Sequence, residues 1–235
     1  MSDPADELCQ ICGHDHFDHR NVLWPGLSQA WELSPDETAY VDVQQGTHCV
    51  RCGSNVRSQA LARALLGVLG GAGPLAAFVD ALDRASPRLL EINEAGTLTP
   101  WLSRLPGHVF ARYPESDMMH LPYADRTFDI VVHSDTLEHV KHPDIGLREC
   151  RRVTRPGGAC IFTVPVIVGR LTRSRRGLPP SFHGHPACTD PDCLVHTEFG
   201  ADVWTYVLEA GFTACELVHF RYPAGLAIVA HRNRS

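Results

Sequence analysis

The sequence predicts an α/β fold with a doubly wound, mostly parallel sheet, preceded by a small metal-binding module. From residue 87 onward, short buried apolar runs alternate with helical patterns, which is typical of a parallel sheet covered on both faces. Before residue 57, cysteines, histidines and acids take the place of such periodic runs. A chain of 235 residues is long enough for one full α/β domain and a small appendage.

The expected strands and helices follow in order along the chain. Leucines spaced by four residues predict a helix from residue 57 to about 69, and a second helix reaches residue 85. The predicted strands cover residues 89–92, 109–110, 128–133, 159–166, 215–221 and 226–231. The predicted helices between them cover residues 99–105, 143–154 and 201–210. The last two strands are joined by a short link, so they are expected to form an antiparallel pair that closes the sheet.

The composition is that of an ordinary globular protein, with 44% hydrophobic and 20% charged residues. No apolar stretch reaches the length of about 18 residues that suggests a membrane span, and the acidic start is unlike a signal peptide. We therefore expect a cytoplasmic protein without a membrane span. The net charge of −6 lies entirely in residues 1–60, so the chain is poorly suited to binding nucleic acid.

Four of the nine cysteines form two Cys-x-x-Cys pairs, a spacing typical of zinc knuckles. The predicted zinc ligands are Cys9, Cys12, Cys49 and Cys52. Gly13 and Gly53 each follow the second cysteine of a pair, where a tight turn commonly needs positive φ. Four thiolates would close the coordination shell, so the zinc would serve stability or docking. The alternative is a set of incidental buried cysteines.

A second group of motifs lies in the α/β part of the chain. The run Leu121-Pro-Tyr-Ala-Asp-Arg-Thr-Phe-Asp-Ile-Val-Val132, then Leu137-Glu-His-Val140 and Arg155-Pro-Gly-Gly158, resembles the class I S-adenosylmethionine-dependent methyltransferases of the type-11 group. Together with these, the segments 91–96, 113–115 and 133–135 resemble a narrower subfamily that bears a zinc ribbon. The resemblance covers about residues 87–232.

The resemblance implies a Rossmann-like sheet of seven strands, with S-adenosyl-L-methionine bound across the carboxyl ends of its first four strands. The Glu91–Gly96 turn would pass the methionine part of the cofactor, the residues at 117–118 would meet the adenine, and those at 133–135 would face the methyl group. The implied cofactor-binding residues are Glu91, Asn93, Glu94, Gly96, Tyr113, Asp117, Met118 and His133. Three regions result: a zinc-ribbon-like module (1–56), a helical linker or cap (57–86) and a methyltransferase domain (87–235).

The sequence departs from that family at two positions. The glycine-rich turn keeps one glycine, Gly96, and the acid expected to hold the ribose hydroxyls is replaced by Arg112. A carboxylate accepts hydrogen bonds from both hydroxyls, whereas a guanidinium accepts none. Either Glu94 or Glu115 takes over this role, or cofactor binding is altered. A zinc-stabilised, non-catalytic binding protein on a methyltransferase fold is therefore one alternative.

The insertion at residues 167–198 is predicted to be an acceptor lid, because it follows a strand whose carboxyl end faces the cofactor. Its potential ligands are His183, His185, Cys188, Cys193 and His196. They are interpreted as a second metal site, as substrate-facing histidines or as a polar lid. Since the positions around His183 and His196 recur in the resembling subfamily, we expect active-site histidines. The predicted base is His183, with His196 and Asp135 as further catalytic candidates, while His139 is expected to be structural.

The same insertion holds four arginines and suggests what the acceptor is. The predicted acceptor-binding residues are Arg170, Arg173, Arg175 and Arg176. Arginine matches phosphate and carboxylate geometry, so the acceptor is expected to be a small, anionic molecule; a solvated loop is the other interpretation. The predicted function is O-methylation of a small polar acceptor such as a sugar or glycoconjugate, with N-methylation as an alternative.

Overall fold

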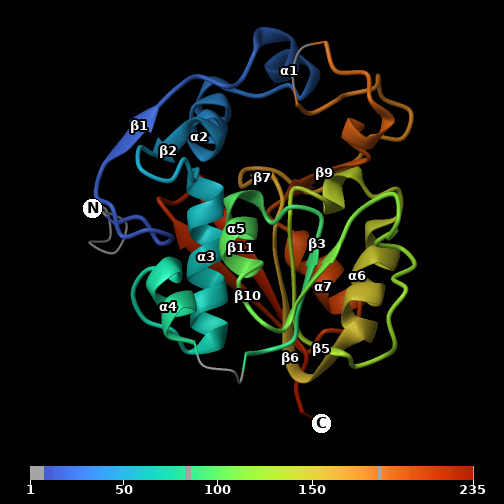
Figure 1. Ribbon diagram of the computed structural model, residues 1–235. Helices are drawn as coiled ribbons and strands as arrows, with labels where there is room; N and C mark the ends of the chain where they lie inside the picture. Colours follow the sequence, from blue (N-terminus) through green and yellow to red (C-terminus); the bar gives the residue numbers. More distant parts are fainter. Residues whose placement is uncertain (1–7, 83–85, 185–186, 235) are drawn as a thin grey trace.

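The computed structural model describes residues 8–82, 86–184 and 187–234 and contains a central six-stranded sheet (Figure 1). The strand order is β10-β11-β6-β5-β3-β4. The strands are β3 (Leu89–Ile92), β4 (His108–Ala111), β5 (Phe128–Ser134), β6 (Thr154–Thr163), β10 (Ala214–Phe220) and β11 (Gly225–His231). Strands β4, β3, β5 and β6 are parallel, whereas β11 runs antiparallel to both β6 and β10. The predicted doubly wound sheet with an antiparallel closing pair is confirmed.

The expectation of seven strands is wrong for the described residues, in which the central sheet has six. In the chain, the missing strand would follow β4 and precede β5, but residues 112–127 form only turns and irregular backbone. Two prolines, Pro114 and Pro122, interrupt this connection. It is also too short to hold both a crossover helix and a further parallel strand.

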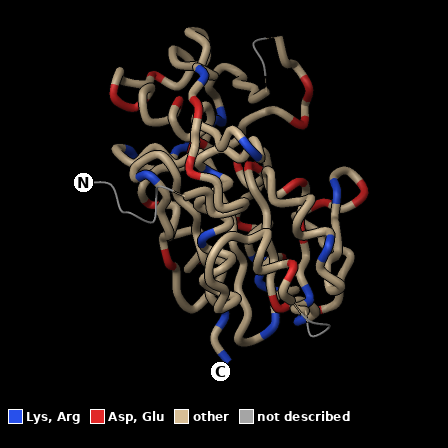
Figure 2. The backbone as a smooth tube through the Cα atoms, turned by 60° about the vertical axis from the view of Figure 1, so that its left-hand side comes forward, with Lys and Arg blue, Asp and Glu red and all other residues tan. Residues whose placement is uncertain are grey.

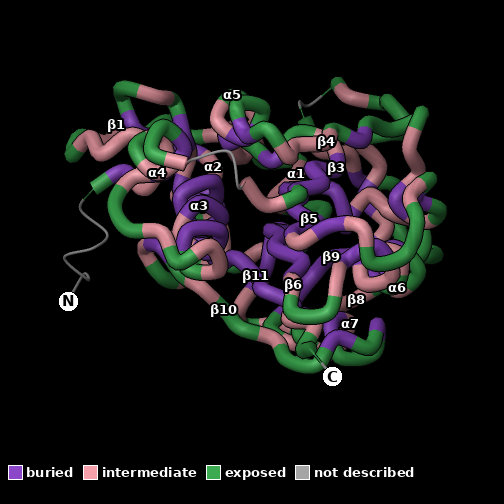
Figure 3. Tube along the Cα trace, turned by 60° about the horizontal axis from the view of Figure 1, so that its bottom comes forward, coloured by how far each residue is buried: buried purple, intermediate pink, exposed green. Residues whose placement is uncertain are grey.

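Helices cover both faces of the sheet (Figure 1). They are α3 (Val56–Leu69), α4 (Leu75–Ala81), α5 (Thr99–Leu102), α6 (Pro143–Val153) and α7 (Val203–Glu209). The side chains of β5 contribute alternately to two separate cores, because successive side chains of a strand point to opposite faces. Ile130 and Val132 pack in the cluster of α3, and Val131 packs in the cluster of α6 and α7. Figure 3 shows α3 and the central strands as the buried centre of the molecule.

Helix α3, which the sequence assigns to a linker or cap, lies against β6, β10 and β11. Ten of its fourteen residues are buried, including Leu61 and Leu65. Asn55 caps its N-terminus by accepting a hydrogen bond from the backbone N–H of Ser58. The helix therefore joins the N-terminal module to the sheet as part of one continuous core.

A roof, defined here as residues 20–46 and 166–200 without the undescribed 185–186, lies above the carboxyl ends of the parallel strands (top of Figure 1). Its N-terminal part holds α1 (Pro25–Ala30) and α2 (Pro35–Gly46) and is flanked by the pair β1 (Phe17–His19) and β2 (Thr47–Cys49). The part after β6 is a three-stranded sheet of β7 (Val166–Ile167), β9 (Thr197–Gly200) and β8 (Arg173–Ser174). The predicted lid insertion thus contains secondary structure of its own.

Contacts between residues far apart in sequence join the two halves of the roof. Trp31 Nε1 donates to Ser181 Oγ at 2.8 Å, and the Tyr40 hydroxyl accepts from the backbone N–H of Val168 at 3.0 Å. Trp31 also packs in an apolar cluster with Ile167 and Val195. The position of the 167–198 segment therefore depends on the N-terminal module.

Lys and Arg are interspersed with Asp and Glu along the backbone (Figure 2). No helix in the described part of the chain is long and apolar enough to cross a membrane.

Candidate functional site

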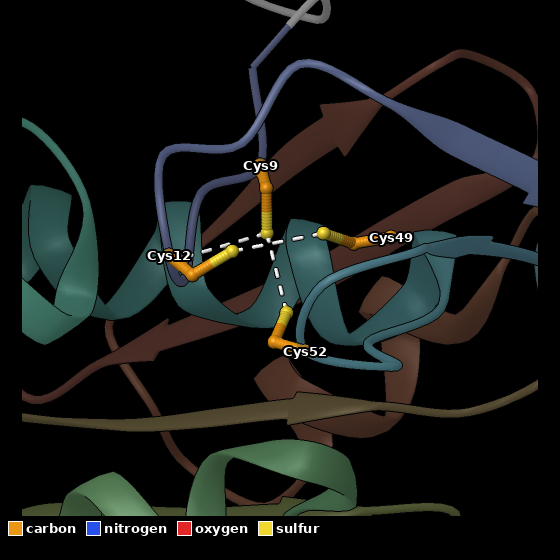
Figure 4. Close-up of side chains that lie close together, drawn as sticks. All are labelled: Cys9, Cys12, Cys49 and Cys52. Atoms are coloured by element: carbon orange, nitrogen blue, oxygen red, sulfur yellow. Dashed lines mark hydrogen bonds between the residues drawn. The ribbon is translucent and has the colours of Figure 1, made fainter.

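The four predicted zinc ligands come together from two loops (Figure 4). Their sulfur atoms all lie within 4.8 Å of one another, and the Sγ–Sγ distances of the pairs Cys9–Cys52 and Cys12–Cys49 are both 3.6 Å. Sulfurs about 2.3 Å from a tetrahedral zinc would lie ~3.8 Å apart. The donor set and its spacing therefore fit a structural zinc ion.

The surroundings of these cysteines support a metal–thiolate cluster. Gly13 and Gly53 have φ of 75° and 73°, as the sequence predicts. The backbone N–H of Cys12 and the side-chain amide of Gln59 both point to the Cys9 sulfur, at 3.4 and 3.3 Å. Gln59 belongs to α3, so the cluster is attached directly to the helix that packs on the sheet.

A cavity of about 660 Å³ lies at the carboxyl ends of β3, β4 and β5. Six of the predicted cofactor-binding residues line it: Asn93, Glu94, Gly96, Tyr113, Asp117 and Met118. Ligands of open α/β sheets bind in this position, outside the carboxyl ends of the strands. Asn93 and Asp135, which both line this cavity, have φ of 52° and 50°. Such left-handed backbone is costly for residues other than glycine and is concentrated at functional sites.

The other two predicted cofactor-binding residues, Glu91 and His133, do not line this cavity. Glu91 is fully buried and accepts hydrogen bonds from Ala95 N, Thr99 Oγ1 and His108 Nε2 at 2.8, 2.6 and 2.7 Å. The buried Glu91 carboxylate therefore holds the turn after β3 in place. His133 is fully buried, on the face of β5 that also carries Val131, and its ring stacks on Phe162 with the ring centroids 4.8 Å apart.

Arg112 occupies the rim of the same cavity beside Glu94. The distance between Arg112 Nη2 and Glu94 Oε1 is 3.7 Å, and both side chains are more than half exposed. Asn93 is held more firmly, because its Oδ1 accepts from the backbone N–H of Tyr113 at 3.0 Å. Glu115 is not among the described residues that line the cavity.

A second cavity of about 430 Å³ lies under the roof. Its apolar lining comes largely from the N-terminal half of the roof: Val22, Leu23, Trp24, Leu27, Trp31, Leu33 and Val41. Its polar lining includes Arg20, Gln45, Asn55, Arg57, Asp135, His139 and His183. Asp135 and His139 line both cavities, so the two spaces meet at these side chains.

Charged and imidazole side chains are concentrated at this junction. Asp135 forms an ion pair with Arg57 of α3, whose side chain is 5% exposed. Glu138 is buried, and its carboxylate oxygens have no hydrogen-bond partner among the described residues. Burial raises the pKa of Glu138 to about 7, against the opposing influence of Arg57. Burial also raises the pKa of Asp135.

The predicted catalytic histidines lie at different cavities. His183 lines the smaller cavity and His196 the larger one. Nδ1 of His183 lies 3.2 Å from Nε2 of His139, and the two rings meet edge to face. Burial lowers the pKa of His183 to about 3 and lowers the pKa of His139 and His196 as well. The structure therefore brings His183 together with His139 and Asp135, but not with His196.

Three of the four predicted acceptor-binding arginines form ion pairs inside the roof. Arg170 contacts both carboxylate oxygens of Glu37, and Arg173 pairs with Glu32 and Glu198. Arg175, whose side chain is 4% exposed, also pairs with Glu198. None of these three, nor Arg176, is among the described residues that line either cavity. The three paired arginines therefore join parts of the roof, and their role in acceptor binding stays a prediction.

The sequence suggested a second metal site in the segment 183–196. Among the described residues, the ligands expected for it do not come together. Cys188 and Cys193 do not join His183 or His196 in a group of converging ligand atoms, and His185 lies outside the described residues. The group that does converge on His183 is Glu138 with His139.

Sequence reasoning missed Arg57, Glu138 and Trp31 and took His139 as structural. The spacing Asp135-x-x-Glu138-His139 after a buried strand was a usable signal, since it places all three at the carboxyl edge. Arg57 and Trp31 gave none, because their roles depend on contacts with residues more than seventy positions away.

The fold and the larger cavity define a doubly wound α/β protein with a candidate ligand site at the carboxyl edge of its sheet. In the comparison with known proteins, residues 75–162 match a family described as "Methyltransferase domain". The chain is 35% identical over 127 residues to a probable S-adenosylmethionine-dependent methyltransferase of Mycolicibacterium smegmatis, covering 51% of this chain and 44% of that protein. It is 32% identical over 96 residues to a demethylmenaquinone methyltransferase of Streptomyces griseus, covering 38% and 41%.

The chain spans about half the length of the curated relatives it matches, or less. A solved structure of a possible histamine N-methyltransferase from Thermotoga maritima is similar to it with a TM-score of 0.43 and 18% identity, covering 68% of this chain and 87% of the other. Residues 75–162 are therefore similar to a methyltransferase domain, and the comparisons support an S-adenosylmethionine-dependent methyltransferase in general terms.

Proposed function

We propose that this protein transfers a methyl group from S-adenosylmethionine in the larger cavity to an acceptor in the smaller cavity. The observation that carries this proposal is the meeting of the two cavities at Asp135 and His139. Methyl transfer needs the acceptor atom in line with the sulfonium at close range, so two adjoining cavities suit it. The domain match supports the cofactor, and the roof supports a separate acceptor site.

The turns after β3 and β4 would hold the cofactor. Asn93 and Gly96 let the backbone approach the methionine part, and Asp117 would accept a hydrogen bond from the adenine amino group. Because Arg112 cannot accept hydrogen bonds, Glu94 at the same rim is the proposed partner of the ribose hydroxyls. Arg112 would then hold the Glu94 carboxylate in place.

The smaller cavity suits a small acceptor with one apolar face and several polar groups. Trp24 and Trp31 offer flat apolar surfaces, and Arg57, Asp135 and His183 offer hydrogen bonds. A sugar ring has this character, so O-methylation of a sugar or glycoconjugate is our first choice. N-methylation is the second, since the same cavity would accept an amine. Because the roof arginines are paired, and Arg57 is paired with Asp135, an anionic group on the acceptor would have to meet Arg20 or compete for Arg57.

The reaction forms a bond between the acceptor oxygen and the methyl carbon and breaks the bond from that carbon to the sulfonium. The sulfur keeps the electron pair and becomes a thioether, and the hydroxyl proton passes to a base. His183 and Asp135 are the candidate bases, because both border the acceptor cavity. Burial raises the pKa of Asp135 and lowers the pKa of His183 to about 3, so Asp135 is the stronger base of the two.

A structural zinc ion on Cys9, Cys12, Cys49 and Cys52 is the other part of the proposal. It would stabilise the loops that connect the N-terminal module to α3, since metal binding at such a site is coupled to folding. It has no open coordination position for substrate.

Calorimetry with S-adenosylhomocysteine tests the cofactor part, and methyl transfer from labelled cofactor to a panel of sugars, phenols and amines tests the acceptor part. We expect saturable binding of one equivalent and transfer to a polar ring acceptor. An absence of binding heat at several temperatures would favour the non-catalytic alternative. Binding without any transfer would leave the domain intact but contradict the proposed acceptor class.

A further inference from the structure

Three potential metal ligands converge at the junction of the two cavities. Glu138 and His139 are adjacent residues of η3 (Leu137–His139), and His183 comes from the roof. Their ligand atoms all lie within 4.8 Å of one another. His183 Nδ1 lies 3.2 Å from His139 Nε2, and Glu138 Oε1 lies 3.8 and 3.9 Å from these nitrogens.

The buried Glu138 carboxylate is an independent indication of a bound cation. Its side chain is 1% exposed, and neither oxygen has a hydrogen-bond partner within the described ranges. Burying a carboxylate without a partner is costly, so such groups are paired or coordinate metals. Arg57, the cation beside this cluster, forms its ion pair with Asp135 instead. Glu138 thus places its Oε1 3.8 and 3.9 Å from the nitrogens of the two imidazoles.

The ring of His139 is oriented as metal-bound histidines usually are. Its Nδ1 lies 3.0 Å from the carbonyl oxygen of Leu194, so Nδ1 carries the proton and donates it to that carbonyl. Nε2 then presents its lone pair to the junction. A histidine that binds a metal through one ring nitrogen usually donates a hydrogen bond from the other, and this bond fixes its tautomer and its direction.

His183 is held at this position by the backbone of its own loop. Its backbone N–H donates to the carbonyl oxygen of Cys193 at 2.9 Å. The preceding residue, Phe182, forms an isolated β-bridge with Leu194. On the other side its ring lies 5.4 Å from the ring of Trp31. Since Leu194 also accepts from His139, one short segment fixes both histidines.

The spacing suits a first-row divalent cation. Two nitrogens bound to zinc at about 2.1 Å in tetrahedral geometry lie ~3.4 Å apart, close to the observed 3.2 Å. Two imidazoles and one carboxylate are ligands suited to zinc and to several other transition metals. Three protein ligands are typical of sites that keep a coordination position open for water or substrate.

We propose that Glu138, His139 and His183 bind a divalent transition-metal ion whose open position faces the acceptor cavity. The ion would connect the roof to the carboxyl edge of the sheet. Its role in catalysis rests on the proposed function: the open position would bind the acceptor hydroxyl and promote loss of its proton. His183 then serves as a ligand, and the proton passes to Asp135, whose Oδ1 has no partner among the residues described here. Metal binding itself does not depend on methyl transfer.

The test measures metal content by mass spectrometry on the full chain, loaded with Zn²⁺ and dialysed, without cofactor or acceptor. We expect two zinc ions per chain in the wild type, one on the cysteines and one at the junction. Glu138→Gln and His183→Ala should each lose one ion, Cys49→Ser should lose the other, and His219→Ala, an exposed residue of β10, should lose none. One ion in the wild type and in Glu138→Gln would overturn the proposal.

Substitution by Co²⁺ assigns each ion to its site. Thiolate ligation gives intense sulfur-to-metal charge-transfer absorption, whereas two imidazoles and a carboxylate do not. Glu138→Gln should keep the charge-transfer bands and lose the weaker bands of the second ion; loss of both sets with intact circular dichroism would count against a separate junction site. Binding of S-adenosylhomocysteine, measured in parallel, reports on the proposed function separately.

Discussion

The body of the molecule and its roof are built in different ways. In the body, α3 and the strands β3, β5 and β6 bury apolar side chains in two continuous cores, and the larger cavity opens at the carboxyl edge of this sheet. In the roof, short elements are joined by ion pairs and by contacts such as Trp31–Ser181, which are 150 residues apart in sequence. The proposed cofactor site therefore rests on the two continuous cores, and the proposed acceptor site depends on the long-range contacts.

Binding specificity can therefore change more readily in the roof than in the body. A cavity between turns of a buried sheet keeps its shape when the surface changes. A cavity under a roof of short helices and loops can change its lining without disturbing the sheet. Substitutions in the two regions should accordingly separate effects on cofactor binding from effects on acceptor binding.

The largest effect is expected from loss of a zinc ligand. Cys49→Ser should abolish zinc binding at the cysteine cluster and lower the free energy of unfolding by more than about 4 kcal/mol, because metal binding there is folding energy. Zinc content and thermal unfolding measure this, with Cys215→Ser on β10 as the matched control. An unchanged unfolding temperature would show that the roof and α3 do not depend on a metal.

Removing His183 should be the next largest effect and should be confined to the acceptor side. His183→Ala is expected to lower kcat by about 10²- to 10⁴-fold, the range for loss of a group that takes part in proton removal. The affinity for S-adenosylhomocysteine should stay nearly unchanged, because His183 does not line the larger cavity. Single-turnover kinetics and calorimetry measure the two quantities. Normal turnover would remove His183 from the mechanism, and His196 and Asp135 would then be tested.

The contrast between body and roof also explains what the sequence could predict. The strands were accessible because buried runs such as 128–133 and 159–166 carry their own signal. The cysteine cluster was accessible because ligand spacing encodes it. The turns in 112–127 were not, since family resemblance suggested a strand that two prolines and a short connection exclude.

The roof arginines are the clearest case in which the sequence alone led to a different interpretation from the folded chain. From sequence, Arg170 and Arg175 stood in a basic stretch without an acid, which favoured a bound anion. Their partners Glu37 and Glu198 lie 133 and 23 residues away, so the pairing depended on the folded chain. Glu138 was overlooked although its place after a buried strand was a usable signal, because only the folded chain shows that it is buried.

The cofactor side is tested by Asp117→Ala. Asp117 lines the larger cavity, and its Oδ1 accepts from the backbone N–H of Met119 at 2.8 Å. Its loss should weaken S-adenosylhomocysteine binding by about 1–3 kcal/mol, the usual cost of leaving a buried donor unpaired. Calorimetry measures the change, and Asp125→Ala, outside the cavity, is the control. Equal affinity in the two variants would mean that the adenine lies elsewhere.

A double-mutant cycle on Arg170 and Glu37 tests how the roof is held. The guanidinium of Arg170 lowers the pKa of Glu37 to about 2, so the pair is ionised at neutral pH. Both side chains are at least three-quarters buried, and we expect a coupling free energy of about 1–2 kcal/mol in unfolding. The variants are Arg170→Met and Glu37→Gln, with Arg176→Met as the control that should change little. A higher acceptor KM without any loss of stability would instead support the interpretation of Arg170 as an anion-binding residue.

The smallest effect is expected at Arg112, which stands where related proteins are expected to carry an acid. Arg112 lies at the exposed rim, 3.7 Å from Glu94, and exposed ion pairs contribute at most about 1 kcal/mol. If Glu94 holds the ribose, Arg112→Glu places a second carboxylate beside it and should weaken S-adenosylhomocysteine binding slightly, by up to about fivefold, whereas Arg112→Gln should be nearly neutral. Glu94→Gln should weaken binding more than either, because it removes the acceptor itself. Tighter binding in Arg112→Glu would show that the ribose lacks its carboxylate in the natural chain and that Glu94 does not replace it. Calorimetry at low and high salt separates the two cases, since repulsion between exposed carboxylates is screened by salt while a direct hydrogen bond to ribose is not.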